Sequence, residues 1–255
     1  MRVALIDADV NAFQAAVVNE KATNWGDGLW TLHAFEEEAE KTFREGIERI
    51  AVATGADKVI LAFSDTENWR KGVLPTYKAN RENTRSPMLR RHMVEYGRAN
   101  YETFTKPTLE GDDVLGILAT RKGTDEMVIC TIDKDLKTVP GFHYNFGKKE
   151  LFEVDEETAD YWHLYQTLVG DATDNYSGCP GVGPVAAKKI LMDGDDHRHF
   201  SNEEMWERVL KAFDKAGLGE EEALVQARVA RICRASDYNF KTQQVKLWTP
   251  KSIST

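Results

Sequence analysis

The sequence predicts an α/β fold built on a mainly parallel sheet that helices flank. Short apolar runs at residues 3–6, 59–63 and 127–132 are typical of buried strands. Segments with helical periodicity separate these runs, as right-handed crossovers between parallel strands require. An aspartate follows each run closely, and ligands of such sheets bind beyond the carboxyl ends of the strands. These observations predict both the fold class and the edge of the sheet at which a site lies.

The first part of the chain is expected to form the sheet and its helices. We predict strands at residues 3–7, 58–64 and 127–133 and helices at about 11–20, 34–54 and 111–122, with a polar loop after the first helix. A further strand and a hairpin at the sheet edge are predicted at residues 142–146 and 150–154, followed by a helix that ends at about residue 168.

The chain after residue 170 is expected to contain only loops and helices. Helices are predicted at about 184–192, 202–216 and 221–235, with a polar loop at 193–200. Gly178, Gly181 and Gly183 precede the first of these helices, and Pro184 suits its first position. Such a helix start either holds a DNA phosphate in a helix–hairpin–helix or is a simple turn between helices, and the stretch alone favours neither. A dinucleotide-binding reading is excluded because no strand precedes the glycines.

Acidic residues recur where the predicted strands end and where helices begin. The clusters are Asp7-Ala-Asp9, Ser64-Asp65, Glu110-Gly-Asp112-Asp113, Asp133-Lys-Asp135 and Asp171-Ala-Thr-Asp174. A single aspartate after a strand is usually a turn former or a helix cap. Because all five clusters are acidic, they favour one shared site. Packed carboxylates repel each other unless a cation lies among them, so that site is expected to hold a cation. Oxygen ligands favour magnesium or manganese.

Charge is distributed unevenly along the chain. The net charge of the 255 residues is −9, which by itself argues against a nucleic-acid partner. Residues 69–106, however, hold nine basic and three acidic side chains, a net charge of +6, so the remainder carries −15. A basic segment beside an acidic cluster is what a metal-dependent phosphodiesterase needs, because the cations attract the phosphate backbone. Lys78 and Arg81 lie in this segment, although a solvated helix face would also explain them.

Composition bounds the remaining alternatives. No apolar run approaches the roughly 20 residues of a membrane span, and the first predicted strand begins too early to leave room for a signal peptide. The three cysteines are odd in number and lack a CxxC spacing, so neither structural disulfides nor a zinc site is expected. We expect a cytoplasmic protein.

Five ordered segments resemble the structure-specific 5′ nuclease superfamily, which includes flap endonucleases and the 5′-nuclease domain of bacterial DNA polymerase I. They are FSDTENWRK at 63–71, YKANR at 77–81, LEGDD at 109–113, IDKDL at 132–136 and GDATDNYSG at 170–178. The similarity is greatest to 5′→3′ exonucleases of short-tailed coliphages, which residues 230–240 and 247–250 also resemble. The resemblance spans nearly the whole chain.

The resemblance implies a PIN-like domain over residues 1–169, with a helical arch at about 69–106. A helical DNA-binding extension with a helix–hairpin–helix would follow over residues 170–255. Two divalent ions would be bound, Mg²⁺ or Mn²⁺. The first would be surrounded by Asp7, Asp65, Glu110 and Asp112, with Asp113 adjacent. The second would be held, partly through water, by Asp133, Asp135, Asp171 and Asp174.

The resemblance also assigns residues to DNA. Lys78 and Arg81 would be the catalytic cations at the base of the arch, contacting the scissile phosphate or the 5′ end. Duplex DNA would be bound with the help of a K⁺ ion among the carbonyls of the helix–hairpin–helix. The DNA-binding residues would be Lys78, Arg81, Arg85, Gly178, Gly181, Gly183, Lys188 and Lys189.

The implied activity is that of a 5′→3′ exonuclease and flap endonuclease that leaves 5′-phosphates. Its substrates would be duplex DNA with a 5′ end, nick or flap, and RNA–DNA hybrids, in phage DNA replication, primer removal or DNA degradation. We expect a monomer in the host bacterial cytoplasm, without a membrane partner.

Two other readings compete with this one. Asp7-Ala-Asp9 also fits the nucleophile pair of a haloacid-dehalogenase-type phosphatase, an enzyme that has no use for a basic arch. The second is a DNA-binding module that has lost its metals, against which the full set of acids argues. Activity on p-nitrophenyl phosphate would indicate the phosphatase, and DNA binding without cleavage would indicate the module without metals.

Overall fold

The structure is a computed structural model that describes residues 1–81, 84–194 and 198–250. Its centre is a six-stranded sheet in the order β5-β4-β1-β6-β7-β8, in which only the β7–β8 pair is antiparallel. The strands are β1 (Arg2–Asp7), β4 (Lys58–Ala62), β5 (Thr103–Phe104), β6 (Glu126–Thr131), β7 (Gly141–Asn145) and β8 (Glu150–Val154). This arrangement confirms the predicted α/β class with a mainly parallel sheet.

Strand β1 is central because its side chains are apolar on both faces. Residues 3–6 are buried, and they pair with β4 on one side and β6 on the other. Ile6 lies opposite Leu61 of β4 and Cys130 of β6, so the three strands end at nearly the same level. Because the strands are parallel, the residues that follow them share one edge of the sheet.

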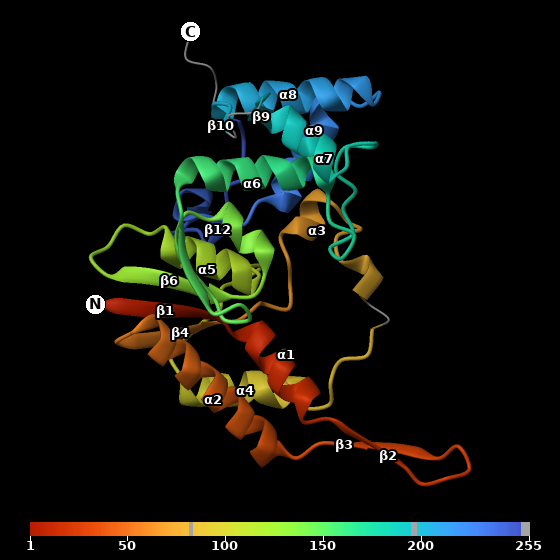
Figure 1. Cartoon of the computed structure of the whole chain (residues 1–255), viewed down its shortest axis with the longest axis vertical. Coiled ribbons are helices and arrows are strands. Elements are labelled where there is room, and N and C mark those ends of the chain that lie inside the picture. The colour runs from red at the N-terminus through yellow and green to blue at the C-terminus, as the bar shows by residue number, and fades with distance from the viewer. Residues whose placement is uncertain (82–83, 195–197, 251–255) are drawn as a thin grey trace.

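Helices cover both faces of the sheet (Figure 1). One face packs against α1 (Ala8–Val18), α2 (Glu36–Thr54) and α4 (Arg90–Asn100). Three alanines of α1, Ala12, Ala15 and Ala16, allow this helix to lie close to the sheet. The other face packs against α5 (Gly111–Ala119) and against the C-terminal residues Ile232, Cys233 and Tyr238.

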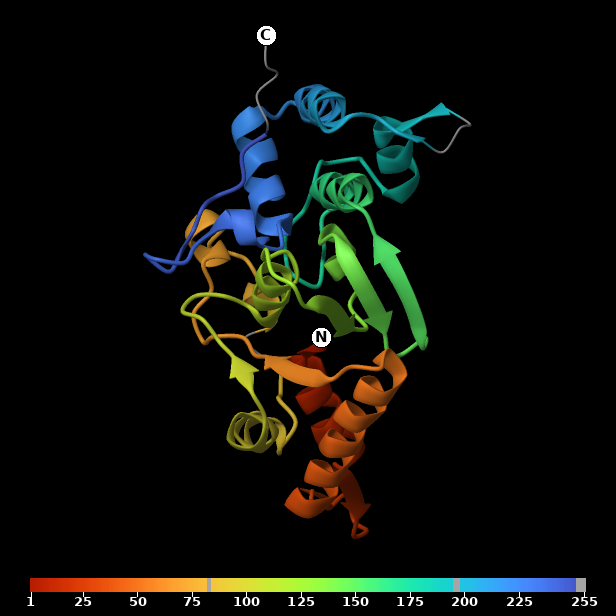
Figure 2. The ribbon, with the colours of Figure 1, turned by 90° about the vertical axis from the view of Figure 1, so that its left-hand side faces the viewer.

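A helical unit stacks on this layered domain. It contains α6 (Glu156–Val169), α7 (Pro184–Leu191), α8 (Asn202–Lys215) and α9 (Glu220–Ala230), whose buried side chains form a separate apolar cluster. Figure 2 shows the sheet between this unit and α2, with the dark blue C-terminal segment returning beside α5. The predicted domain boundary at 169/170 therefore does not separate the packing, because α6 packs with the later helices and residues 232–238 return to the sheet.

Several local expectations differ from the structure. The predicted polar loop is an antiparallel hairpin, β2 (Lys21–Asn24) and β3 (Trp30–His33), whose mostly exposed residues lack a buried alternating face. Helix α1 begins at Ala8 rather than at residue 11, because the Asp7 carboxylate accepts a hydrogen bond from Val10 N at 3.2 Å and caps the helix. Helix α9 ends at Ala230 instead of residue 235.

The basic segment is not one continuous arch over residues 69–106. It contains α3 (Arg70–Val73), a 3₁₀ turn (Ala79–Arg81), α4 and β5. Helix α4 packs against α1 and α2, because Met93 and Gly97 belong to its buried face. Val73 of α3 and Tyr77 pack against Val229 of α9 and Tyr176, and residues 82–83 of the connection to α4 lie outside the described part of the chain.

The remaining short elements are two further 3₁₀ turns and two small hairpins. The turns are Lys134–Thr138 and Ala235–Asp237, and the hairpins are β9 (Met192–Asp193) with β10 (Arg198–His199) and β11 (Tyr238–Asn239) with β12 (Gln244–Val245). The predicted polar loop at 193–200 falls partly on residues 195–197, outside the described residues. None of the helices in the described ranges is both long and apolar enough to cross a membrane.

Candidate active site

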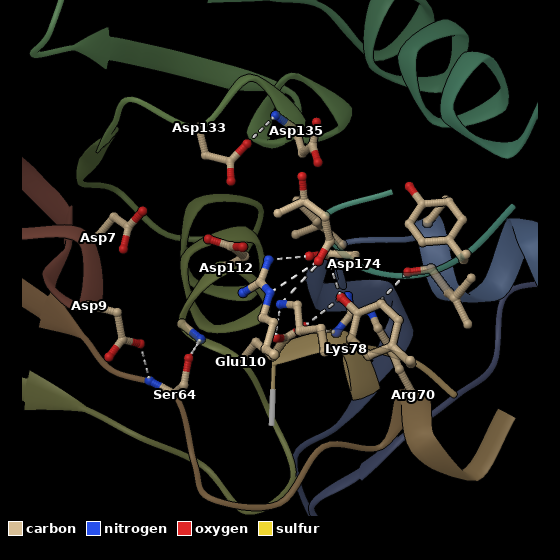
Figure 3. A pocket seen from close by; sticks show the side chains of 18 of the residues that line it. Asp7, Asp9, Ser64, Arg70, Lys78, Glu110, Asp112, Asp133, Asp135 and Asp174 are labelled. Atoms are coloured by element: carbon tan, nitrogen blue, oxygen red, sulfur yellow. Dashed lines mark hydrogen bonds and ion pairs between the residues drawn. The ribbon is translucent and has the colours of Figure 1, made fainter. Parts of the chain in front are cut away.

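A cavity of about 340 Å³ opens where the central strands end (Figure 3). Asp7 ends β1 and Asp133 follows β6, so the parallel strands bring these two carboxylates to one edge. The Oδ2 atom of Asp7 accepts a hydrogen bond from Thr131 Oγ1 at 2.9 Å, which fixes the side chain from the neighbouring strand. The acidic residues that line the cavity are Asp7, Asp9, Glu110, Asp112, Asp133, Asp135 and Asp174.

The first turn of α5 supplies two of these carboxylates. Glu110 is the N-cap residue and Asp112 follows in the first turn, where the helix dipole favours negative charge. The backbone approaches the end of β4 closely, since Gly111 N donates a hydrogen bond to Ser64 Oγ at 2.9 Å. A Cβ atom at position 111 would lie 3.2 Å from Asp9 Oδ2, so glycine makes room for that carboxylate.

A buried arginine lies behind the cavity. The guanidinium of Arg70 forms two hydrogen bonds of 2.7 Å with Asp113 and one of 3.0 Å with Glu110. It also donates to the carbonyl oxygens of Val229 and Arg231, which connects the end of α9 to the site. Burial acts to raise the pKa of Asp113, but the adjacent Arg70 cation outweighs it and holds that pKa below its usual value.

The segment after α3 packs on the loop that follows α6. Lys78 forms ion pairs with Glu110 and with Asp174, the latter at 3.6 Å, and Arg81 also pairs with Asp174. The hydroxyl of Tyr77 lies 3.1 Å from Glu110 Oε2 and 2.8 Å from Asp174 Oδ2. Burial raises the pKa of Tyr77, so its hydroxyl stays a neutral donor between the two carboxylates.

Of the other carboxylates of the cavity, only Asp135 forms an ion pair in the described ranges, with Lys134 Nζ 3.5 Å from its Oδ1 atom. Burial raises the pKa of Asp7 to about 7, opposed by the hydrogen bonds from Thr131 and Val10. Burial, and then the charges of Asp7 and Asp133, raise the pKa of Asp112 well above its ordinary value. Burial and the charge of Asp133 raise the pKa of Asp135 to about 6. Ionising all of them together is therefore costly unless a cation enters.

The structure places six of the nine predicted metal ligands at the cavity and three away from it. Asp65 lies outside, because its Oδ2 atom accepts a hydrogen bond from Thr108 N at 2.8 Å. Asp113 is fully buried and is occupied by Arg70. Asp171 accepts a hydrogen bond from Thr173 N at 2.6 Å and lies 3.6 Å from Lys134 Nζ.

Asp9, Tyr77 and Arg70 are among the residues at the site that the sequence interpretation did not assign to it. Asp9 lines the cavity, and its place two residues after Asp7 was the available signal. Tyr77 immediately precedes Lys78, but an aromatic residue in a basic segment gives no indication that its hydroxyl meets two acids. Arg70 gave no signal, because nothing local distinguishes it from the exposed cations around it.

The predicted DNA-binding residues fall into two groups. Gly181, Gly183, Lys188 and Lys189 are exposed at and after the start of α7, where Gly183 is the N-cap residue and Pro184 the first residue, as predicted. Gly178 is buried: its N–H donates to Gln226 Oε1, and a Cβ there would lie 2.4 Å from Gly170 N.

The remaining predicted DNA contact, Arg85, is exposed and pairs with Glu20. Helix α6 ends at Val169 and α7 begins at Pro184, so no helix lies directly before the 178–183 loop.

The donor set of the cavity fits hard divalent cations. All its anionic groups are carboxylates, the ligands that Mg²⁺ and Mn²⁺ prefer. The buried Oδ1 atom of Asp135 accepts no hydrogen bond of normal length in the described residues; its cationic neighbour is the exposed Lys134, 3.5 Å away, whose place a divalent ion would take. Within residues 1–81, 84–194 and 198–250, no three acidic, histidine or cysteine side chains already lie close enough to hold an ion, so carboxylates would turn toward it.

The chain is similar in sequence to known exonucleases and flap endonucleases. Curated relatives include the exodeoxyribonuclease of Enterobacteria phage T3, 32% identical over 97% of this chain and 93% of its own length, and the exonuclease of Escherichia phage T7, 30% identical over 96% and 93%. The flap endonuclease Xni of Vibrio campbellii is 26% identical over 80% of this chain and 84% of its own.

The fold is also found among solved structures. The T5 D15 protein co-crystallised with metal ions superposes with a TM-score of 0.64 at 14% identity, over 90% of this chain and 89% of its own. The sequence model of the 5′-3′ exonuclease N-terminal resolvase-like domain matches residues 2–158. With the parallel sheet, the acidic cavity at its edge and relatives along nearly its whole length, the chain belongs to the 5′-3′ exonuclease family.

Proposed function

We propose that this chain is a metal-dependent 5′→3′ exonuclease and structure-specific flap endonuclease that hydrolyses DNA phosphodiester bonds and leaves 5′-phosphates. The observation that carries the proposal is one cavity, at the ends of parallel strands, in which carboxylates with raised pKa values adjoin the buried Arg70 and the half-buried Lys78. The phage T3 and T7 relatives are named exonucleases and the Vibrio relative a flap endonuclease, which supports both activities.

The carboxylates of the cavity are the proposed ligands of two divalent ions, Mg²⁺ or Mn²⁺. Asp7, Glu110 and Asp112 would hold one ion, and Asp133, Asp135 and Asp174 the other. In such a site a pair of divalent ions supplies water activation and stabilisation of the leaving 3′ oxygen. Solved structures of T5 proteins are described with metal ions, one of them with zinc, which is consistent with this assignment.

The basic side chains next to the acids have a different task. Lys78 and Arg81 lie at the cavity and pair with Glu110 and Asp174. The oxygens of an entering phosphate group can replace these carboxylates as partners of the two cations. A positioned ammonium group stabilises charge that develops on the phosphate in the transition state. Tyr77 would keep Glu110 and Asp174 in place while the cations move.

Duplex DNA with a 5′ end, nick or flap is the proposed substrate. The exposed start of α7 offers backbone amides and two lysines, Lys188 and Lys189, to a DNA backbone. We include in the proposal the helix–hairpin–helix reading of residues 178–189, with a K⁺ ion among its carbonyls. Activity on RNA–DNA hybrids, a monomeric state and a place in phage DNA replication within the host cytoplasm also belong to the proposal.

The haloacid-dehalogenase reading receives no support from these findings. It would make Asp7 and Asp9 a nucleophile pair, whereas the family match and the named relatives are nucleases.

Cleavage assays test the proposal. 5′-labelled blunt, nicked, flapped and RNA–DNA hybrid duplexes would be incubated with Mg²⁺ or with EDTA, with Asp133→Asn as the matched inactive variant. We expect Mg²⁺-dependent release of 5′-phosphorylated products from the wild type only. Cleavage that persists in EDTA, or that Asp133→Asn retains, would contradict the assignment.

A further inference from the structure

The end of β4 lacks the carboxylate that its place beside β1 and β6 predicts. Strand β1 is followed by acidic residues of the cavity, and so is β6. After β4 and Phe63, the residue at the cavity is Ser64, and Asp65 turns to the 107–109 loop. Its backbone N–H donates to Leu109 O at 2.9 Å, and its carboxylate accepts from Thr108 N, so both groups hold that loop.

Asp9 brings a carboxylate to this place from another element. Its Oδ2 atom accepts a hydrogen bond from Ser64 N at 2.8 Å, so the acid lies directly on the end of β4 (Figure 3). The same oxygen is the nearest atom to a Cβ built on Gly111, one residue before Asp112. Asp9 therefore lines the same cavity as Asp7 and Asp112.

No lysine or arginine neutralises Asp9 in the described ranges. Ion pairs hold Glu110 and Asp174 on the opposite side of the cavity, but none is formed by Asp9. One backbone N–H orients the carboxylate and leaves its other oxygen available. Carboxylates that ligate a metal ion are commonly oriented in this way, by a hydrogen bond from a neighbouring group.

We propose that Asp9 is a ligand of the divalent ion bound between Asp7 and Asp112, and that it takes the role expected of Asp65. The inference rests on the proposed nuclease function and deepens its metal site. Asp65 is then a structural residue of the 107–109 loop. The chemistry of the site is unchanged, because a carboxylate on helix α1 replaces one after strand β4.

Mn²⁺ binding to the DNA-free protein, followed by electron paramagnetic resonance, tests this proposal. Asp9→Asn and Asp65→Asn each remove one negative charge and keep an oxygen that can accept the same backbone hydrogen bond. We expect Asp9→Asn to weaken Mn²⁺ binding by about 10-fold or more, and Asp65→Asn to leave it within about 2-fold of the wild type. The Mg²⁺ concentration for half-maximal cleavage should rise with Asp9→Asn alone.

A rescue variant separates ligation from structure. Asp9→Asn combined with Ser64→Asp returns a carboxylate to the end of β4, so Mn²⁺ binding should recover by several-fold over Asp9→Asn. Thermal unfolding would check that each variant is folded.

Normal Mn²⁺ binding by Asp9→Asn, or an equal loss with Asp65→Asn, would overturn the inference, even if Asp112→Asn, which removes a ligand of the proposed site, loses binding. If the wild type itself neither binds Mn²⁺ nor cleaves DNA, the proposed function fails.

Discussion

The two sides of the cavity contain the same kind of acid in opposite electrostatic settings. On one side, Arg70 and Lys78 lie against Glu110, and although burial raises its pKa, these cations bring it below the ordinary value. On the other side, Asp7 and Asp112 have no such partners, and burial raises their pKa values. Both sides are buried, so the difference comes from the cations.

The contrast shows which part of the site is complete in the folded chain. The cation-paired side is held by hydrogen bonds from Arg70, Tyr77 and Lys78 and needs no further ion for its charge. The cation-poor side is destabilised by its own charges, as functional sites often are. A divalent ion relieves that cost, so we expect folding and metal binding to be linked there.

The largest expected effect comes from removing a carboxylate of the cation-poor side. Asp112→Asn or Asp133→Asn should lower the single-turnover rate of DNA cleavage by roughly 1000-fold or more, equivalent to about 4 kcal/mol. The Kd for DNA, measured by fluorescence anisotropy in Ca²⁺, should change little. Near-normal cleavage by either variant would contradict the claim that the carboxylates of the cation-poor side bind the catalytic ions.

On the cation-paired side the main loss should be stability. Arg70→Gln leaves Asp113 buried without its partner, so the free energy of unfolding should fall by about 3–5 kcal/mol in urea denaturation. The double variant Arg70→Gln/Asp113→Asn removes both charges and should recover most of that loss. A double variant no more stable than Arg70→Gln would show that the ion pair is not the cause.

Asp7→Asn should stabilise the metal-free protein at alkaline pH. The pKa of Asp7 is raised from 3.8 to about 7 in the folded state, so the folded chain holds a proton that the unfolded chain loses between these values. Stability therefore falls as pH rises from about 4 to about 7, by an upper bound of about 4 kcal/mol. Thermal unfolding in EDTA should give a higher Tm for Asp7→Asn than for the wild type at pH 8, with the difference vanishing near pH 4. An equal Tm at pH 8 would contradict the raised pKa.

A smaller effect is expected from Lys78. Lys78→Ala should lower single-turnover cleavage by about 100-fold, roughly 2.7 kcal/mol, because it removes charge stabilisation at the phosphate. Lys189→Ala is the matched control: an exposed lysine on α7 should weaken DNA binding and its salt dependence, and leave the rate at saturating DNA intact. The assignment would be refuted if both variants changed only the Kd.

The layered fold and most of the site followed from local patterns. Buried apolar runs predict β1, β4 and β6, and parallel strands bring Asp7 and Asp133 to one edge whatever lies between them. The position of Asp65 could not be predicted in this way. Successive side chains of a strand point to opposite sides, so a shift of one residue decides whether Ser64 or Asp65 faces the cavity.

The burial of Arg70 was also beyond sequence patterns. Two of its partners, the carbonyls of Val229 and Arg231, lie about 160 residues further along the chain. Only the return of the C-terminal segment to the sheet brings them together, and no local periodicity encodes that contact. The basic segment was predicted as a helical arch at about 69–106, whereas one of its cations, Arg70, is a buried part of the site.

The central claim, that divalent ions bind on the cation-poor side, is tested most directly by the Tm of the DNA-free protein at pH 8 as Mg²⁺ is added. A ligand that binds only the folded state raises stability with its concentration. We predict that Mg²⁺ raises the Tm of the wild type and has little effect on Asp112→Asn. A wild-type Tm that does not respond to Mg²⁺, or one that rises equally in both proteins, would contradict the account.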